Sequence, residues 1–266
     1  MLSTKSFQQN GLLQTSINAD SPHLVNIICY PSFDISEYLI RLDEIHSLGV
    51  RYVVLGGRSV LGKIAIAGKG CVSLVLKAEF RDHTSCALKV RRVDANRISM
   101  EREAELHMIA NSAGVGPRIF GASKNIIIME FIDGLSVIDW IRQQENDSDR
   151  RIVIKIIIEI LEQCYLLDRA HLDHGQLSHL DHHVIVSSSY DVTLIDFESS
   201  STDRRTANVT SAAQSLLLSG SISKRLNNKL SLEKKKESLI CSLKSYKSCQ
   251  SRTNFDRILD VVLERA

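Results

Sequence analysis

The stretch Cys86-Ala87-Leu88-Lys89-Val90 places one lysine inside an apolar run that predicts a β-strand. A lone lysine in such a strand either lies on an exposed face or pairs with a carboxylate. The next segment, residues 99–111, is rich in Glu, Ala, Leu and Met and predicts a helix. This helix offers three glutamates that, taken alone, indicate only a solvated helix face: Glu101, Glu103 and Glu105.

Upstream of this lysine, Gly68-Lys69-Gly70 joins two further predicted strands, Ile64–Ala67 and Val72–Ala78. Glycines at such a junction let backbone N–H groups approach phosphate oxygens, which a side chain would block. The simpler alternative is a plain hairpin turn. The glycines and the lysine together favour phosphate binding over a turn followed by a solvated helix.

Asp196 directly follows the predicted apolar strand Val192–Ile195. A carboxylate that emerges from a strand end is a good ligand for a hard cation such as Mg²⁺, which binds through few carboxylates together with substrate phosphates. The sequence therefore predicts a metal site at Asp196.

The composition is that of a globular protein large enough for one large core or two modest lobes, with 266 residues, 44% of them hydrophobic and 24% charged. No apolar run approaches the roughly 20 residues that span a bilayer. Residues 1–20 are polar, resemble no signal peptide and are predicted to be loosely held. The six cysteines show no C-x-x-C spacing, so we expect a cytoplasmic protein with reduced thiols.

Charge is distributed unevenly along the chain. Residues 201–266 hold 13 Lys and Arg against 6 Asp and Glu, whereas the first 200 hold 20 against 25. The basic C-terminal region, which includes Lys234-Lys235-Lys236, predicts binding to an anionic partner such as RNA or a ribonucleoprotein. The alternative is a solvated helix face.

Residues 60–215 resemble the RIO-type and related atypical protein kinases of archaea, in particular a set of archaeal predicted serine/threonine kinases. The motifs that carry this resemblance are Arg102-Glu103-Ala104, Gly114-Val115-Gly116-Pro117-Arg118, Met129-Glu130-Phe131-Ile132-Asp133-Gly134, Asp196-Phe197-Glu198 and Asn208-Val209-Thr210.

The resemblance implies an α+β, bilobal protein-kinase-like fold, with a small antiparallel β-sheet and one helix in the N-lobe and a mainly helical C-lobe. The predicted order, strands first and helices after a hinge near Glu130, agrees with it. A long activation segment is not expected, since no proline follows Pro117. We expect an N-terminal extension at 1–58, an N-lobe at 59–131, and a C-lobe with basic C-terminal helices at 132–266.

The resemblance also implies ATP and Mg²⁺ as cofactors, and roles for individual residues. Lys89 would hold the phosphates of ATP, and Glu103 would position Lys89. Asp196 would bind the metal. The phosphates would be covered by Gly68 and Gly70, and the adenine would be met by Met129, Glu130 and Ile132.

The departures from the kinase pattern lie in the loop His174-Gly175-Gln176-Leu177-Ser178. Gln176 occupies the position of the catalytic aspartate, and an amide can orient an acceptor hydroxyl but cannot take its proton. Either Asp181 or His183 could fill the role of the second metal ligand. Glu198 replaces a glycine that supplies backbone freedom rather than chemistry, so metal binding at Asp196 can survive the change.

We therefore expect a protein serine/threonine kinase that acts on a protein substrate or on itself. Two alternatives remain: an ATP-binding pseudokinase that docks partners, and a small-molecule or RNA-associated phosphotransferase. A zinc site is a further alternative, because histidines and aspartates crowd the same loop. They are His171, His174, His179, His182 and His183, with Asp173 and Asp181.

Overall fold

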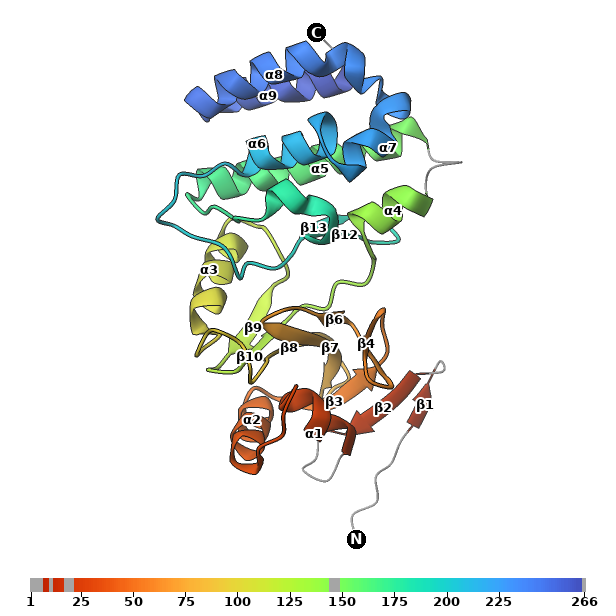
Figure 1. Ribbon diagram of the computed structural model, residues 1–266, viewed down its shortest axis with the longest axis vertical. Coiled ribbons are helices and arrows are strands. Elements are labelled where there is room, and N and C mark those ends of the chain that lie inside the picture. The colour runs from red at the N-terminus through yellow and green to blue at the C-terminus, as the bar shows by residue number, and fades with distance from the viewer. Residues whose placement is uncertain (1–6, 10–11, 17–21, 144–148, 265–266) are drawn as a thin grey trace. The chain divides into compact units, whose positions relative to one another are not determined.

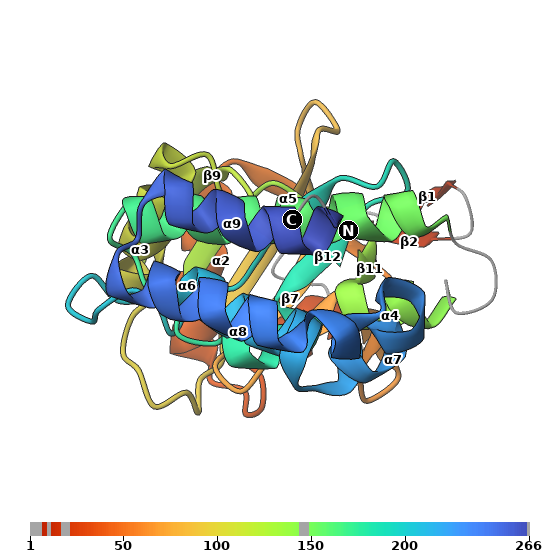
Figure 2. The ribbon, with the colours of Figure 1, turned by 90° about the horizontal axis from the view of Figure 1, so that it is seen from above.

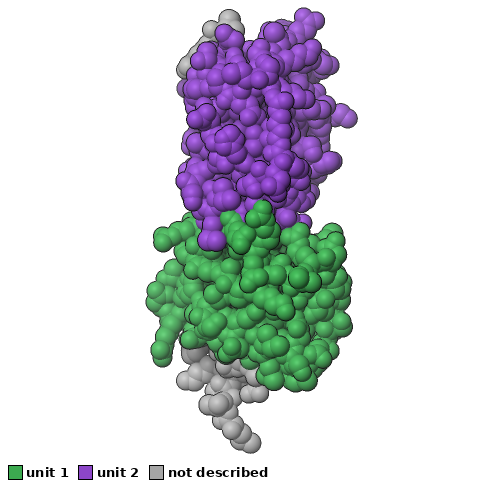
Figure 3. Space-filling model, turned by 90° about the vertical axis from the view of Figure 1, so that its left-hand side faces the viewer, with its two compact units in different colours: residues 1–105, 118–131 green, residues 106–117, 132–266 purple. Residues whose placement is uncertain are grey.

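The computed structural model describes residues 7–9, 12–16, 22–143 and 149–264, and the chain divides into two compact units (Figures 1 and 3). The first unit comprises residues 1–105 and 118–131, and the second comprises 106–117 and 132–266. The predicted N-terminal extension and most of the predicted N-lobe thus lie in a single unit.

An antiparallel sheet forms the centre of the first unit, with the strand order β1-β2-β3-β7-β8-β10-β9 and with β6 paired to β7. A separate hairpin pairs β4 with β5. The strands are β1 (Phe7–Gln9), β2 (Leu12–Ser16), β3 (Val50–Leu55), β4 (Ser59–Leu61), β5 (Ile64–Ile66), β6 (Gly68–Lys69), β7 (Ser73–Phe80), β8 (Ser85–Arg91), β9 (Ile119–Ala122) and β10 (Ile126–Met129).

Strands β1 and β2 extend this sheet in a segment for which the sequence predicted only loosely held chain. The prediction was wrong for residues 7–9 and 12–16. Strand β2 pairs with β3 and β1 pairs with β2, so backbone pairing holds a polar stretch that has no apolar pattern of its own. The remainder of residues 1–20 lies outside the described part of the chain.

Two helices of the first unit, α1 (Pro22–Ile28) and α2 (Ile35–Ser47), share one core with alternate residues of the sheet. Leu74 and Leu76 of β7 and Leu88 and Val90 of β8 belong to this core. Because side chains alternate across a strand, Val75 and Lys89 lie on the opposite face. Helix α3 (Glu101–Ser112) begins in the first unit and ends in the second.

The second unit is mainly helical, and one apolar core runs through it. Helices α8 and α9 lie side by side and pack over α5 and α6 (Figures 1 and 2). Its elements are β11 (Leu135–Ser136), α4 (Val137–Gln143), α5 (Arg150–Arg169), the 3₁₀ helix η1 (Leu177–His182), β12 (Val184–Val186), β13 (Val192–Leu194), α6 (Asn208–Ala213), the π-helical turn η2 (Gln214–Leu218), α7 (Ser221–Leu230), α8 (Leu232–Ser248) and α9 (Arg252–Leu263).

The structure confirms the predicted class: an α+β chain with an antiparallel sheet first and a helical part after it. In the described ranges, no helix combines the length and the apolar character that crossing a membrane would require.

Candidate functional site

Lys89 and Glu103 form a buried ion pair in the first unit. The Nζ atom of Lys89 on β8 lies 2.5 Å from Oε1 of Glu103 on α3, and the two side chains are 6% and 2% exposed. Arg97, in the connection between these elements, places a guanidinium nitrogen 3.6 Å from the second Glu103 oxygen. Because burying charges is costly and a buried pair seldom stabilises a fold, this arrangement indicates a functional role.

The other two glutamates of α3 lie at the surface and make local contacts. Glu101 accepts a hydrogen bond from Ser99, and Glu105 pairs with Arg102 at 3.1 Å. The tertiary structure therefore brings only Glu103 of the three to Lys89.

The register of the sheet aligns the glycine segment with Lys89. Gly68 pairs with Val75, Val75 pairs with Lys89, and Lys89 pairs with Ile127. Residues directly opposite in antiparallel strands lie on the same face, so these residues form a row across the sheet. In the next row, Ala87 pairs with Met129.

The glycine segment is closed by a short backbone contact. The Gly70 amide donates to the Ser73 carbonyl at 2.8 Å, and Arg92 donates to the Gly70 carbonyl at 2.9 Å. Ser73, the first residue of β7, is buried. The segment is thus a tight turn at the end of the strand row that contains Lys89.

Glu130 follows β10 and is tied to the chain before β9. Its amide donates to the Arg118 carbonyl at 2.8 Å, and its side chain accepts from the Arg118 amide at 3.3 Å. The Glu130 amide is thus bonded within the first unit. Ile132 begins the second stretch of the second unit.

Asp196 adopts a backbone conformation that is uncommon for a residue other than glycine, with φ 71°. Such strain persists only where the surroundings impose it, and it concentrates at functional sites. The Asp196 carboxylate lies 3.8 Å from Nδ1 of His183, and the Ile195 amide donates to the His183 carbonyl at 2.9 Å. Glu198 is not among the residues with positive φ, so no glycine is needed at its position.

His174 supports the backbone beside Asp196. Its side chain is fully buried, and its Nε2 lies 3.1 Å from the Ile195 carbonyl, to which it donates. Burial, followed by the nearby His183, lowers the pKa of His174 to about 4. His174 is therefore neutral near pH 7 and serves as a hydrogen-bond donor.

Phe197, the residue after Asp196, is enclosed by the second unit. Its ring centroid lies 4.5 Å from that of His107 and 5.2 Å from that of His174. Gly116 has φ 83°, and a Cβ atom there would lie 2.6 Å from the Phe197 ring. Gly116 of the Gly114–Arg118 motif thus makes room for the phenylalanine that follows Asp196.

A buried aspartate, Asp168, anchors the loop that contains His174. It accepts hydrogen bonds from the amides of Asn208 and Val209 and from the Tyr246 hydroxyl. Burial raises the pKa of this carboxyl, and these hydrogen bonds oppose the shift. Asn208 in turn accepts from the His174 amide at 2.8 Å, so the loop backbone is held at a defined place.

Gln176 lies at the start of η1, and its Oε1 atom is buried without a hydrogen-bond partner among the described residues. Gly175 before it has φ 84°, and a Cβ atom there would lie 2.6 Å from the Ser199 carbonyl. The amide oxygen of Gln176 is thus an acceptor that the described side chains and backbone do not satisfy.

The two candidates for a second metal ligand differ in their contacts. Asp181 accepts a hydrogen bond from Ser221 at 2.7 Å, at the start of α7. His183 instead faces Asp196, so the geometry favours His183. In the described residues, no cluster of three or more His, Cys, Asp or Glu suited to a metal occurs.

Sequence reasoning missed the supports of these groups. The anchor Asp168 lies inside the long helix α5, and Arg97 lies in a loop without a motif. Asp168 could have been found from the sequence, because an aspartate among the apolar residues of an amphipathic helix predicts a buried partner.

Comparison with protein-family models matches the RIO domain to residues 75–210. This is half of the chain, and the protein belongs to the RIO domain family, a family of atypical kinase-like proteins. None of the curated proteins searched matches the chain. Gly68 and Gly70 precede the matched segment, whereas Lys89, Glu103, Gln176 and Asp196 lie within it.

Proposed function

We propose that this protein is an atypical serine/threonine kinase that transfers the γ-phosphoryl group of ATP to a protein hydroxyl or to one of its own. The observation that carries the proposal is the buried pair of Lys89 and Glu103. A lysine held by a carboxylate next to a glycine turn is suited to contact the phosphates of a nucleotide. ATP binding and a divalent metal also agree with membership of the RIO domain family.

The residues of the second unit supply groups suited to metal binding and to positioning the acceptor. Asp196 offers a partly exposed carboxylate and His183 a nearby imidazole. This donor set fits Mg²⁺ only in part, since Mg²⁺ prefers oxygen ligands. Asp196 would therefore be the principal ligand, and the metal when bound would neutralise charge on the β- and γ-phosphates.

Gln176 would orient the acceptor, because its free Oε1 can accept a hydrogen bond from the hydroxyl. In the transfer, a bond forms between the hydroxyl oxygen and the γ-phosphorus, and the bond from that phosphorus to the bridging oxygen breaks to release ADP. The amide cannot take the hydroxyl proton, which then passes to a phosphate oxygen or to water. Positioning and charge neutralisation dominate phosphoryl transfer, so a base is the part most easily spared.

A second candidate is a pseudokinase that binds ATP to maintain its shape and docks partners. The observation that favours it is the amide of Gln176 in place of a base. Incubation with γ-labelled ATP and Mg²⁺ separates the two, with the Asp196→Asn variant as background. A kinase labels itself or an added protein above that background. Binding of ATP without labelled protein would contradict the kinase proposal and favour the pseudokinase.

A further inference from the structure

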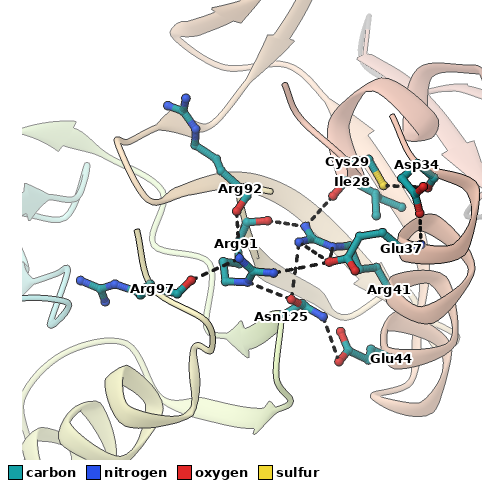
Figure 4. A network of polar contacts seen from close by, with 10 residues as sticks. All are labelled: Ile28, Cys29, Asp34, Glu37, Arg41, Glu44, Arg91, Arg92, Arg97 and Asn125. Carbon is teal, nitrogen blue, oxygen red and sulfur yellow. Dashed lines mark hydrogen bonds and ion pairs between the residues drawn. The ribbon is translucent and has the colours of Figure 1, made fainter. Parts of the chain in front are cut away.

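Residues 28–41, which precede the RIO match, form hydrogen bonds with the end of strand β8. Arg41 of α2 is fully buried and donates hydrogen bonds to the carbonyls of Ile28 and Arg91 (Figure 4). One residue beyond Arg92, the Val93 amide donates to the Tyr30 carbonyl at 2.9 Å. Residues 91 and 93 are thus both bound to the N-terminal segment.

Arg92, between these two attachments, reaches the glycine turn. Its amide donates to the Val72 carbonyl at 2.8 Å, and its guanidinium donates to the Gly70 carbonyl at 2.9 Å. Asp94 holds the same guanidinium with two hydrogen bonds of 2.9 and 2.7 Å. The guanidinium is therefore a fixed link between the end of β8 and the turn.

The Tyr30 ring contacts both cations that border this turn. The Lys69 ammonium lies 4.9 Å from the ring centroid, and the Arg92 guanidinium carbon lies 5.0 Å from it. Both distances are within the range of cation–π attraction. Lys69 stands between the two glycines, so the ring contacts the turn at the residue that separates them.

We propose that Tyr30 and Arg92 form a brace that holds the turn at residues 68–72 in the conformation that receives the phosphates of ATP. This inference rests on the proposed function and deepens it. A glycine-rich turn loses conformational freedom when it binds a ligand, and ordering it beforehand reduces that cost. Tyr30 is then a positioning residue, and the N-terminal segment is a part of the nucleotide-binding apparatus.

The test compares three full-length variants with the natural sequence: Tyr30→Leu, Tyr30→Phe and Phe33→Leu. Phe33 is the matched control, an aromatic residue in the same segment that is 52% exposed and packs on Tyr38. Two quantities are measured: the Kd for ATP with Mg²⁺ by calorimetry, and the amide hydrogen exchange of residues 68–73 without nucleotide.

We expect Tyr30→Leu to weaken ATP binding about fivefold or more and to speed exchange at residues 68–73, since two cation–π contacts are lost. Tyr30→Phe keeps the ring and should stay within about twofold, as should Phe33→Leu. Unchanged affinity in Tyr30→Leu overturns the positioning role, even if exchange is faster. Equal losses in Tyr30→Leu and Phe33→Leu also overturn it, because they indicate general destabilisation.

The exchange measurement separates this inference from the proposed function. If the natural protein binds no nucleotide, the proposed function fails, and the positioning role fails with it. Even then, faster exchange at residues 68–73 in Tyr30→Leu but not in Phe33→Leu would support the brace. Exchange equal to that of the natural protein would refute it.

Discussion

The Lys89 region of the first unit and the Gln176 region of the second unit differ in how closely they keep the chemistry of a kinase. Around Lys89, regular strands and one helix bring together the lysine, the glutamate and the glycine turn that the sequence singled out. Around Gln176, an amide stands at the position of the base, and His183 lies beside Asp196.

The departure around Gln176 is not a loss of structure. His174 is buried, and Asp168 and Asn208 fix the loop backbone by several hydrogen bonds. A loop that had merely decayed would not retain such costly buried polar groups. The comparison teaches that the Lys89 region keeps the residue types that a kinase uses, whereas the residue at the base position differs within a loop that hydrogen bonds hold in place.

The largest effect is expected from Lys89→Ala, which removes the ion pair of Lys89 with Glu103. Removing the lysine leaves Glu103 buried without its main partner, which typically costs about 3–5 kcal/mol of stability. We expect ATP binding or labelling activity to fall about 100-fold or more.

A double variant, Lys89→Met with Glu103→Gln, separates the two effects. Its stability, measured by urea unfolding, should recover because no unpaired charge remains, whereas its ATP binding should not. Unchanged ATP affinity in Lys89→Ala would contradict the assignment of this region.

The pH dependence of stability tests the frame around Gln176. The pKa of His174 is lowered from 6.5 to about 4 in the folded protein, so the unfolded chain binds a proton first as pH falls. The contribution of neutral His174 to the free energy of unfolding is fully present above pH 6.5. About 3 kcal/mol of it is lost as the pH falls from 6.5 to about 4. Urea unfolding should show a shallower loss over that window in His174→Gln. Identical slopes in both proteins would contradict a buried, neutral His174.

Asp196→Asn tests whether the second unit still binds metal. We expect the dependence of ATP affinity on Mg²⁺ to fall about tenfold or more, because the principal carboxylate ligand is lost. The control is Asp181→Asn, since Asp181 is bonded to Ser221 and should change the Mg²⁺ dependence little. If Asp181→Asn has the larger effect in a Mg²⁺ titration, the preference for His183 over Asp181 is wrong.

Gln176→Asp would restore the altered part of the site. A carboxylate can accept the hydroxyl proton, and general-base assistance is worth about 10²- to 10⁴-fold where the geometry is ideal. We expect a more modest rise, about tenfold, in the initial rate of labelling. Gln176→Asn is the matched control, because asparagine has the length of aspartate but carries an amide, and this variant should show no rise. An equal rate for the two variants would favour the pseudokinase.

The smallest effect is expected at the basic C-terminal region. Of its three consecutive lysines, Lys234 and Lys236 are exposed, whereas Lys235 is buried and donates to the Val262 carbonyl. Replacing the two exposed lysines by Ala should weaken binding to RNA and reduce its salt dependence by about one unit of slope per lysine. If the natural protein shows no salt-sensitive binding to RNA, only the solvated-face interpretation remains.

Much of this could be predicted from the sequence because it depends on local pattern. Apolar runs predicted strands close to β7 and β8, and the order of strands and helices agreed with the α+β class. The role of Lys89 depends on one strand and one neighbouring helix, which lie close in the chain. Strands β1 and β2 could not be predicted, because backbone pairing of β2 with β3 and of β1 with β2, rather than composition, holds them.

The sequence by itself determined which chemical groups are present and in what order: the glycines, Lys89, the glutamates of α3, Gln176 and Asp196. Only the tertiary structure decided which of them meet. It turned Glu103 inward and left Glu101 and Glu105 at the surface, and it set His183 rather than Asp181 beside Asp196. It also brought Tyr30 to Lys69 across nearly forty residues of chain. The physical reason is that periodicity fixes the face on which a residue lies, whereas its partner depends on contacts between elements far apart in sequence.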